Sequence, residues 1–296
     1  MTREKALKSL KWYANLKGFV WAFGLLCFLI DPASARPKIG LALGGGGAKG
    51  GAHIGVLKVL ERENVPVDFI AGTSIGSIVG ALYALGYGAD EIEKIMLSIP
   101  WDKGYSDTID RENLPFRNKQ RGQFNIPLDI GYNHGEVMTS SGVIYGQSAS
   151  LLLRQAFGNL PTFNSFDDLP VPYRAVATNL STNEAVVLDS GDLLLAAKAS
   201  SNVPGILAPT KYKNLLLVDG GITKNIPVDV VKTSGADHVI AVDIGEHLAQ
   251  SKDLKDAFSI LGQLSSFLTV SSSDSQIKRL APSDLLIRPD IEGLST

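Results

Sequence analysis

A serine set between glycines has the clearest potential for chemistry in this chain. The pentapeptide consists of Gly72, Thr73, Ser74, Ile75 and Gly76. An apolar run at 67–71 precedes it and small apolar residues follow at 77–85, so the order strand, tight turn, helix is expected. In that context G-x-S-x-G is typical of a nucleophile elbow, whose strained turn lifts the serine hydroxyl clear of the backbone. An ordinary strand–helix turn with an inert serine is the alternative, because short motifs also occur by chance.

A glycine-rich loop precedes this pentapeptide and leads out of the first expected strand. Its residues are Gly44, Gly45, Gly46, Gly47, Ala48, Lys49 and Gly50. Successive glycines expose backbone N–H groups with no side chains in the way, and such a nest before a helix binds anions. Beside a serine nucleophile these amides would form an oxyanion hole, which stabilises the tetrahedral intermediate of acyl transfer.

Nucleotide binding is the competing interpretation of this loop. The spacing of Gly45, Gly47 and Gly50 fits the G-x-G-x-x-G dinucleotide fingerprint. That fingerprint needs an acidic residue at the end of the second strand to hold the ribose, and Ala71 stands there. A phosphate-binding Walker loop needs Ser or Thr after its lysine, whereas Gly50 follows Lys49. The sequence therefore favours the oxyanion hole.

An aspartate supplies the third chemical feature. Asp219, Gly220 and Gly221 follow the apolar run 215–218. An aspartate at the carboxyl end of a strand lies on the edge where α/β proteins place their sites, although an Asp-Gly turn is common in itself. The histidines are His53, His134, His238 and His247, and no sequence context singles one out as a base. His53 is interpreted as a packing residue, while His238 and His247 would fit a Ser–Asp–His order.

Short apolar runs alternate with helical patterns along most of the chain. Strands are expected at 38–43, 67–71, 173–179, 184–189, 215–218 and 238–243, and helices at 54–63, 77–85 and 89–97, the last with Asp90 as N-cap. Such alternation predicts an α/β fold: a three-layer α/β/α sandwich around a mostly parallel sheet. Residues 100–140 break the rhythm with aromatic, proline and glycine residues, which suggests a lid or substrate-facing loop or else a passive surface excursion.

The N-terminus carries an expected export signal. Basic residues precede an uncharged apolar run at 19–30, and Ala33-Ser34-Ala35 fits a cleavage site, so residues 1–35 are interpreted as a signal peptide and 36–296 as one catalytic domain. An uncleaved membrane anchor is the alternative. Five of the 28 basic and two of the 30 acidic residues lie in 1–35, which leaves a net charge of −5. No nucleic-acid partner is expected from that balance. The single cysteine, Cys27, would leave with the signal.

The three ordered motifs together resemble the patatin-like phospholipase family, and most closely its bacterial branch. The similarity covers about residues 38–290, with the motifs in a core of about 38–245. It implies a Ser–Asp dyad without histidine, in which Ser74 is the nucleophile and Asp219 the base. It also implies an oxyanion loop of Gly45, Gly46 and Gly47, with Lys49 and Gly50 beside them and Lys49 holding the loop in shape. The serines of 193–205 are taken as structural.

This resemblance implies a lipid acyl hydrolase of the phospholipase A or esterase type, which acts on phospholipids or other acyl lipids at a membrane surface. No cofactor and no metal are expected. An acyltransferase, a short-chain esterase and a catalytically silent lipid-binding protein stay open as alternatives. The chain stops soon after 285–290, where relatives usually continue through another helix, so a compact secreted form and a truncated sequence both stay open.

Overall fold

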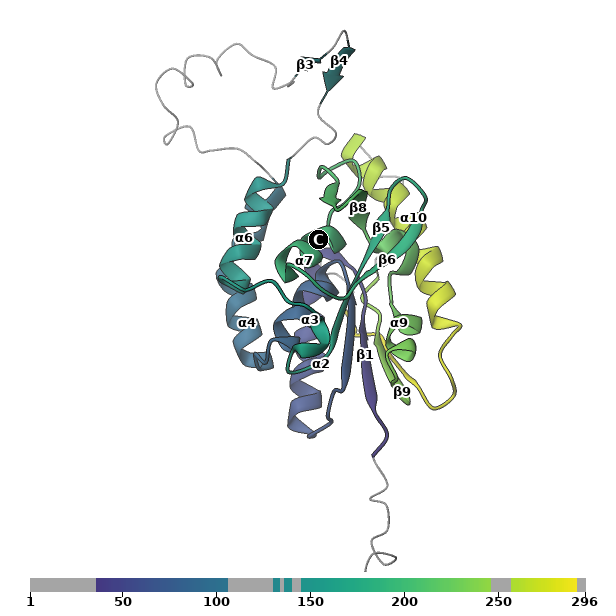
Figure 1. Cartoon of the computed structure of the whole chain (residues 1–296). Coiled ribbons are helices and arrows are strands. Elements are labelled where there is room, and N and C mark those ends of the chain that lie inside the picture. The colour runs from purple at the N-terminus through teal and green to yellow at the C-terminus, as the bar shows by residue number, and fades with distance from the viewer. Residues whose placement is uncertain (1–35, 106–129, 134–135, 140–144, 246–256, 292–296) are drawn as a thin grey trace, which may run out of the picture. The chain divides into compact units, whose positions relative to one another are not determined.

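The computed structural model describes residues 36–105, 130–133, 136–139, 145–245 and 257–291 (Figure 1). The chain divides into two compact units at Pro37, and every described helix and strand belongs to the second unit. The assignments of 1–35 and of 36–296 as signal peptide and catalytic domain stay predictions, because 1–35 lie outside the described residues. In the part of the chain that is described, no helix is both long and apolar enough to span a bilayer.

An eight-stranded mixed sheet forms the centre of this unit. Its strands are β1 (Ile39–Leu43), β2 (Phe69–Thr73), β5 (Tyr173–Asn179), β6 (Glu184–Leu188), β7 (Thr210–Tyr212), β8 (Leu215–Asp219), β9 (His238–Val242) and β10 (Leu285–Ile287). The order is β10-β9-β1-β2-β5-β8-β7, and β6 also pairs with β5. The run from β10 to β5 is parallel, as predicted. The pairs β5–β6 and β7–β8 are antiparallel because short turns join their strands, and β8 also runs antiparallel to β5.

Helices cover both faces of the sheet, which confirms the predicted α/β sandwich (Figure 1). Those on one side are α2 (Gly51–Arg62), α3 (Ile75–Ala84), α4 (Ala89–Ser98), α6 (Gln147–Phe157) and α7 (Leu193–Ser200); those on the other are α8 (Gly221–Lys224), α9 (Val228–Thr233) and α10 (Ala257–Ile277). Alternation along β1 produces the two cores: Leu41 and Leu43 pack with the first group, and Ala42 packs with Val231 of α9. Short 3-10 turns lie at Gly47–Gly50 (η1), Trp101–Tyr105 (η2) and Phe166–Asp168 (η4).

Two sequence predictions need correction. The α4 helix starts at Ala89 with Gly88 as its N-cap rather than Asp90, because the Glu91 carboxylate turns back to accept the Gly88 N–H at 3.0 Å. The α2 helix begins at Gly51, three residues before the predicted start, since glycines carry no apolar signal for the pattern to detect.

Most of the irregular segment 100–140 lies outside the described residues. Its described parts are η2 and a hairpin of β3 (Ile130–Asn133) with β4 (Glu136–Thr139). The lid therefore stays a prediction.

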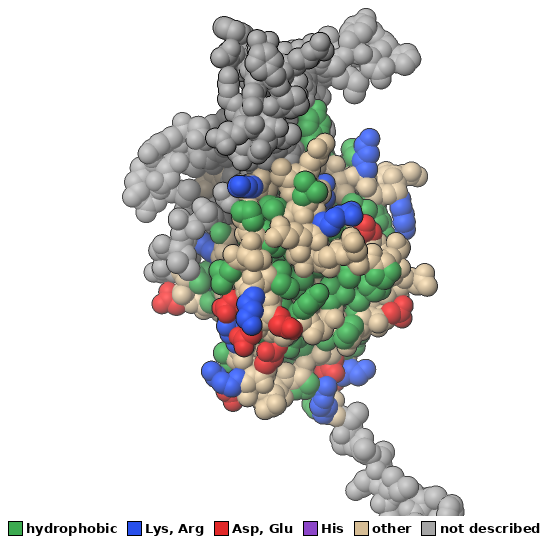
Figure 2. Space-filling model, turned by 90° about the vertical axis from the view of Figure 1, so that its left-hand side faces the viewer, with side chains coloured by type: hydrophobic (Ala, Val, Ile, Leu, Met, Phe, Trp, Pro, Cys, Tyr) green, Lys and Arg blue, Asp and Glu red, His purple; other side chains and the backbone are tan. Residues whose placement is uncertain are grey.

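Figure 2 views the molecule from the side on which α4 and α6 lie. Exposed hydrophobic side chains run across the middle of that face, and charged ones gather below them. The exposed large hydrophobic residues of these two helices are Leu97 and Leu151.

Candidate active site

The serine elbow is a strained turn between β2 and α3. Ser74 has φ 54° and ψ −126°, a conformation that residues with a Cβ rarely adopt. A Cβ at Gly72 would lie 2.4 Å from the Gly76 carbonyl oxygen, and one at Gly76 would lie 2.4 Å from that of Leu43. Both flanking glycines are therefore required, because strand and helix approach too closely for any side chain.

Hydrogen bonds to two other segments hold this turn. The Ser74 N–H donates to Ser200 Oγ at 2.9 Å, and Ser200 Oγ donates to the Val176 carbonyl at 2.6 Å. Thr73 Oγ1 donates to the carbonyl of Lys224 at 2.8 Å. Sequence reasoning treated the α7 serines as structural and so missed that Ser200 contacts the elbow. No local signal separates Ser200 from its neighbour Ser201, because the contact spans 126 residues.

Asp219 ends β8 directly beside the serine. Ser74 Oγ donates to its Oδ2 at 2.7 Å, and the Gly221 N–H donates to its Oδ1 at 2.7 Å. The side chain is buried, with 8% of the residue exposed. Burial raises the pKa of Asp219 to about 6, and the bonds from Ser74 and Gly221 oppose that rise. A Cβ at Gly220 would lie 2.1 Å from the Val176 carbonyl oxygen, so the residue after the aspartate must be glycine.

The glycine loop lies against the serine elbow, and its backbone amides differ in whether they already donate a hydrogen bond. The Gly45 N–H donates to the Asn225 carbonyl at 3.2 Å, so in this conformation the amide that was predicted as an oxyanion donor already has an acceptor. The amides of Gly46 and Gly47 donate to no acceptor among the described residues. Gly47 also lines the pocket with Ser74. Among the described residues, no acceptor thus competes with a bound oxyanion for these two amides.

Lys49 and Gly50 take different places in the loop. Within the described residues the Lys49 side chain makes no hydrogen bond or ion pair; its backbone N–H donates to the Gly46 carbonyl at 3.3 Å, and its carbonyl accepts the Gly51 N–H. Bracing of the loop by the Lys49 side chain thus stays a prediction. A Cβ on Gly50 would lie 2.1 Å from Ile75 Cγ1, so Gly50 lets η1 pack on the start of α3.

The described histidines do not contact Ser74. His53 is completely buried, and its Nε2 donates to the Gly44 carbonyl at 2.7 Å. Burial lowers the pKa of His53 to about 4, so the ring is neutral and serves to hold the start of the glycine loop, in keeping with its predicted packing role. His238 begins β9, where its Nδ1 is buried with no partner among the described residues. His134 and His247 lie outside the described residues.

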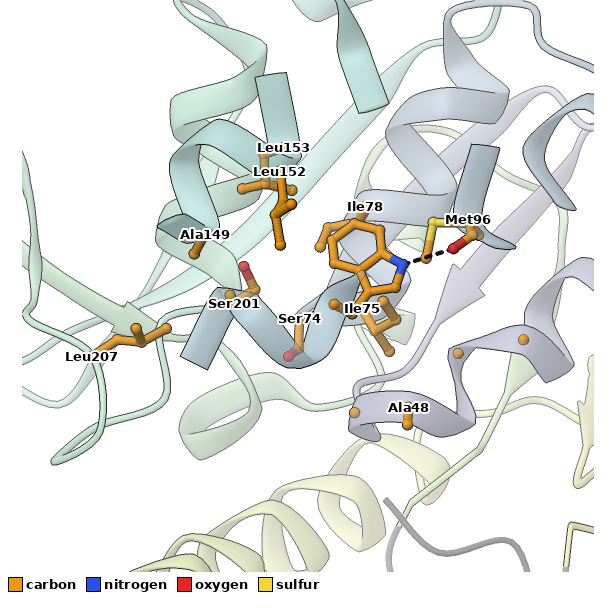
Figure 3. A pocket seen from close by; sticks show the side chains of 15 residues that line it. Ala48, Ser74, Ile75, Ile78, Met96, Ala149, Leu152, Leu153, Ser201 and Leu207 are labelled. Carbon is orange, nitrogen blue, oxygen red and sulfur yellow. Dashed lines mark hydrogen bonds between the residues drawn. The ribbon is translucent and has the colours of Figure 1, made fainter. Parts of the chain in front are cut away.

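An apolar pocket of about 400 Å³ opens above Ser74 (Figure 3). Its lining residues are Gly47, Ala48, Gly50, Gly51, Ser74, Ile75, Ile78, Met96, Trp101, Gly104, Ala149, Leu152, Leu153, Ser201 and Leu207. The indole of Trp101 is fixed by its Nε1, which donates to the Met96 carbonyl at 2.8 Å. Residues of α6 face Ile78 and Met96 across the cavity (Figure 3). A pocket of this size and lining suits an apolar chain next to the serine hydroxyl.

A serine on a strained strand–helix turn, bonded to a buried carboxylate below an apolar pocket, is the arrangement of a serine hydrolase with a Ser–Asp pair. The chain belongs to the patatin-like phospholipase family, whose model matches residues 41–232.

Curated relatives share this region. A patatin-like phospholipase domain-containing protein of Caenorhabditis elegans is 35% identical over 209 residues, covering 70% of this chain and 14% of that protein. A lysophospholipase of Lodderomyces elongisporus is 30% identical over 243 residues, covering 82% of this chain and 14% of that protein. The chain thus spans about a seventh of the length of these relatives. Among solved structures, a chain of the ExoU–SpcU complex of Pseudomonas aeruginosa is similar at 19% identity and a TM-score of 0.39, covering 82% of this chain and 52% of that one.

Proposed function

We propose that this chain is a lipid acyl hydrolase, which cleaves carboxylic esters of phospholipids or other acyl lipids. The observation that carries the proposal is the 2.7 Å hydrogen bond from Ser74 Oγ to the buried Asp219 carboxylate. The apolar pocket beside this pair and the membership in the patatin-like phospholipase family support a lipid as the substrate. The name of one relative, a lysophospholipase, agrees with that class.

The geometry supports a two-step mechanism. Asp219 Oδ2 accepts the proton of Ser74 Oγ as the oxygen attacks the ester carbonyl, and the amides of Gly46 and Gly47 stabilise the oxyanion. The alcohol or lysolipid leaves with a proton from Asp219, and the acyl group stays on Ser74 while its chain lies in the pocket. Asp219 then deprotonates a water molecule, which hydrolyses the acyl-enzyme.

A carboxylate is a weak base, and the site offsets this weakness by burial. The ordinary pKa of an aspartate lies near 4, so a solvated Asp219 would hold a proton from serine poorly. Burial raises the pKa of Asp219 to about 6, which makes it a better proton acceptor while it stays ionised at neutral pH. The bond from Gly221 keeps the carboxylate oriented so that Oδ2 faces the serine.

Labelling with a fluorophosphonate tests the assignment of these residues. We expect wild-type protein to be labelled and to hydrolyse a phospholipid, Ser74→Ala to lose both, and Asp219→Asn to lose turnover. Ser98→Ala is the matched control, because Ser98 is an exposed serine whose Oγ bonds only within α4. Labelling that survives in Ser74→Ala would contradict the nucleophile. Loss of turnover in His238→Ala, with Asp219→Asn still active, would replace the dyad by a triad.

Product analysis separates hydrolysis from its alternatives. With a lipid alcohol present as acceptor, a hydrolase releases free fatty acid, whereas an acyltransferase forms a new ester. A short-chain esterase would cleave only soluble esters. A protein that binds lipid but neither reacts with the fluorophosphonate nor hydrolyses an ester would be a catalytically silent lipid-binding protein. Turnover that a chelator abolishes would contradict the expected absence of a metal requirement.

We further propose that the chain is exported and belongs to the bacterial branch of the family. The basic segment, apolar run and Ala33-Ser34-Ala35 site in residues 1–35 support export. The resemblance of the residues in and around the three motifs to those of bacterial family members supports the branch. Mass spectrometry of the protein purified from its native source should find an N-terminus near Arg36. An intact Met1 on that protein would contradict export by cleavage.

A further inference from the structure

The long helix α10 buries polar side chains along part of one face. Ser272, Ser273 and Gln276 on this helix are buried, whereas four large hydrophobic residues among its described side chains are between 47% and 53% exposed. Those four residues are Ile260, Leu264, Phe267 and Leu268. A surface helix normally buries its apolar stripe, and a buried hydroxyl needs a hydrogen-bond partner. The buried polar stripe therefore requires an explanation from what it contacts.

The partner of this stripe is Asn225, which follows α8. The Asn225 N–H donates to Ser272 Oγ at 2.6 Å, and Asn225 Nδ2 donates to Ser273 Oγ at 2.9 Å. Only 2% of Asn225 is exposed. Both ends of the residue, its backbone and its side chain, are thus fixed by adjacent serines of one helix.

Asn225 in turn holds the glycine loop. Its carbonyl accepts the Gly45 N–H at 3.2 Å, and its Nδ2 also lies 3.4 Å from the Gly45 carbonyl oxygen. A Cβ on Gly45 would lie 2.7 Å from Asn225 Oδ1 and 3.0 Å from the Cβ of Ser74, so Gly45 is enclosed between the asparagine and the nucleophile. The next two residues carry the amides that meet no acceptor in the described part of the chain. The position of Gly45 therefore sets where those amides lie relative to Ser74.

The same helix also packs against the other half of the site. A Cβ on Gly221 would lie 2.9 Å from Thr269 Cγ2, and Gly221 is the residue whose N–H orients Asp219. Thr269 stands three and four residues before the two serines, on the same face of α10. One face of α10 thus contacts Gly221, whose N–H orients the base. Through Asn225 the same face also contacts Gly45, which directly precedes the oxyanion donors.

We propose that Asn225 is a positioning residue for the reaction, which holds the glycine loop in register with Ser74, and that the polar stripe of α10 fixes Asn225 for this task. The proposal rests on the proposed function, because the register matters only if the loop stabilises an oxyanion. It explains why α10 buries the hydroxyls of Ser272 and Ser273. It also assigns a role to two serines that no catalytic motif contains.

The test compares Asn225→Ala and Ser273→Ala with Gln276→Ala. Gln276 is the matched control: it lies on the same face of α10 and accepts the Asp229 N–H at 3.2 Å, so its loss removes a buried bond of α10 without touching Asn225. The assay measures kcat and KM on a soluble ester, the rate of fluorophosphonate labelling, and Tm. A small misplacement of an active-site group lowers turnover by about 10²-fold, so we expect that loss in kcat for Asn225→Ala and about 10-fold for Ser273→Ala, with KM unchanged.

The control separates positioning from stability. We expect Gln276→Ala to lower Tm as much as Ser273→Ala does, yet to keep wild-type kcat, and Ser273→Thr, which retains the hydroxyl, to restore kcat. Equal kcat losses in Gln276→Ala and Ser273→Ala would overturn the proposal, as would a wild-type kcat in Asn225→Ala. If Asn225→Ala fails to fold, Ser273→Ala and Ser273→Thr carry the same test.

Hydrogen exchange distinguishes failure of this proposal from failure of the proposed function. The Gly45 amide should exchange faster in Ser273→Ala than in wild type and Gln276→Ala, whether or not the protein hydrolyses an ester. Unchanged exchange with an active wild type would refute the positioning role alone. Faster exchange in a wild-type background that neither labels nor turns over would refute the hydrolase and leave Asn225 as a purely structural brace.

Discussion

Replacing the buried aspartate by asparagine should stabilise the fold while it removes activity. Asp219 is the carboxylate that accepts the Ser74 hydroxyl, and its burial raises its pKa from 3.8 to about 6. One pKa unit corresponds to about 1.4 kcal/mol, so ionised Asp219 costs the folded state about 3 kcal/mol at neutral pH. The asparagine side chain of Asp219→Asn would carry no charge, and it could still accept the Gly221 N–H and contact Ser74.

The sign of the pH dependence follows from the direction of the shift. Between about pH 4 and pH 6 the folded state keeps the Asp219 proton that the unfolded chain has released, so this group lowers wild-type stability as pH rises through that window. Well below pH 3.8 the carboxyl is neutral in both states. The stability difference between Asp219→Asn and wild type should therefore be near zero at low pH and reach its full value above about pH 6.

Denaturant unfolding of both proteins, at matched pH values between 4 and 8, measures this difference. Other titrating groups are the same in the two proteins and cancel. For a domain of this size, about 3 kcal/mol corresponds to a Tm increase of about 6–12 °C. A variant that is less stable than wild type at pH 8 would refute the claim that burial destabilises the ionised form of Asp219. So would a stability difference between the two proteins that does not change with pH.

Other consequences of the site can be measured separately. The value of kcat/KM should fall about tenfold per pH unit below pH 6, because only ionised Asp219 accepts the serine proton, and a flat profile from pH 4 to 9 would contradict this. Gly76→Ala should prevent folding or abolish activity, since its Cβ would lie 2.4 and 2.6 Å from two carbonyl oxygens. The control Gly55→Ala, whose Cβ would meet no atom within 4 Å, should raise Tm slightly. Ser200→Ala should lower stability by about 1–3 kcal/mol and reduce kcat, because the partly buried Ser74 N–H loses its acceptor and the buried Val176 carbonyl loses a donor; wild-type values in both assays would count against that role.

The sequence was sufficient to predict the parts of the site that depend on neighbouring residues. Gly72 is required by the close approach of β2 to the helix that follows it, and Gly76 by the close approach of that helix to the end of β1, and both glycines are visible in a five-residue motif. The six predicted strands lie within two residues of those observed, and buried ones such as β1 and β9 show the continuous apolar runs that burial between two helical layers imposes. Local rules failed at Asp90 and at the start of α2, where the chain uses Gly88 as N-cap and helical glycines without an apolar pattern.

Only the tertiary structure decided which distant groups meet. The choice between Asp219 and a histidine as partner of Ser74 depends on how β8 pairs with β5, and no spacing in the chain encodes that pairing. The contacts of Ser200 and Asn225 were missed for the same reason, since they span 126 and 180 residues and carry no motif. The structure also separated the loop amides, because Gly45 donates to Asn225 and leaves the donors of the next two residues available. Sequence patterns report short-range sterics and burial, whereas hydrogen bonds between segments far apart exist only once the sheet has brought those segments together.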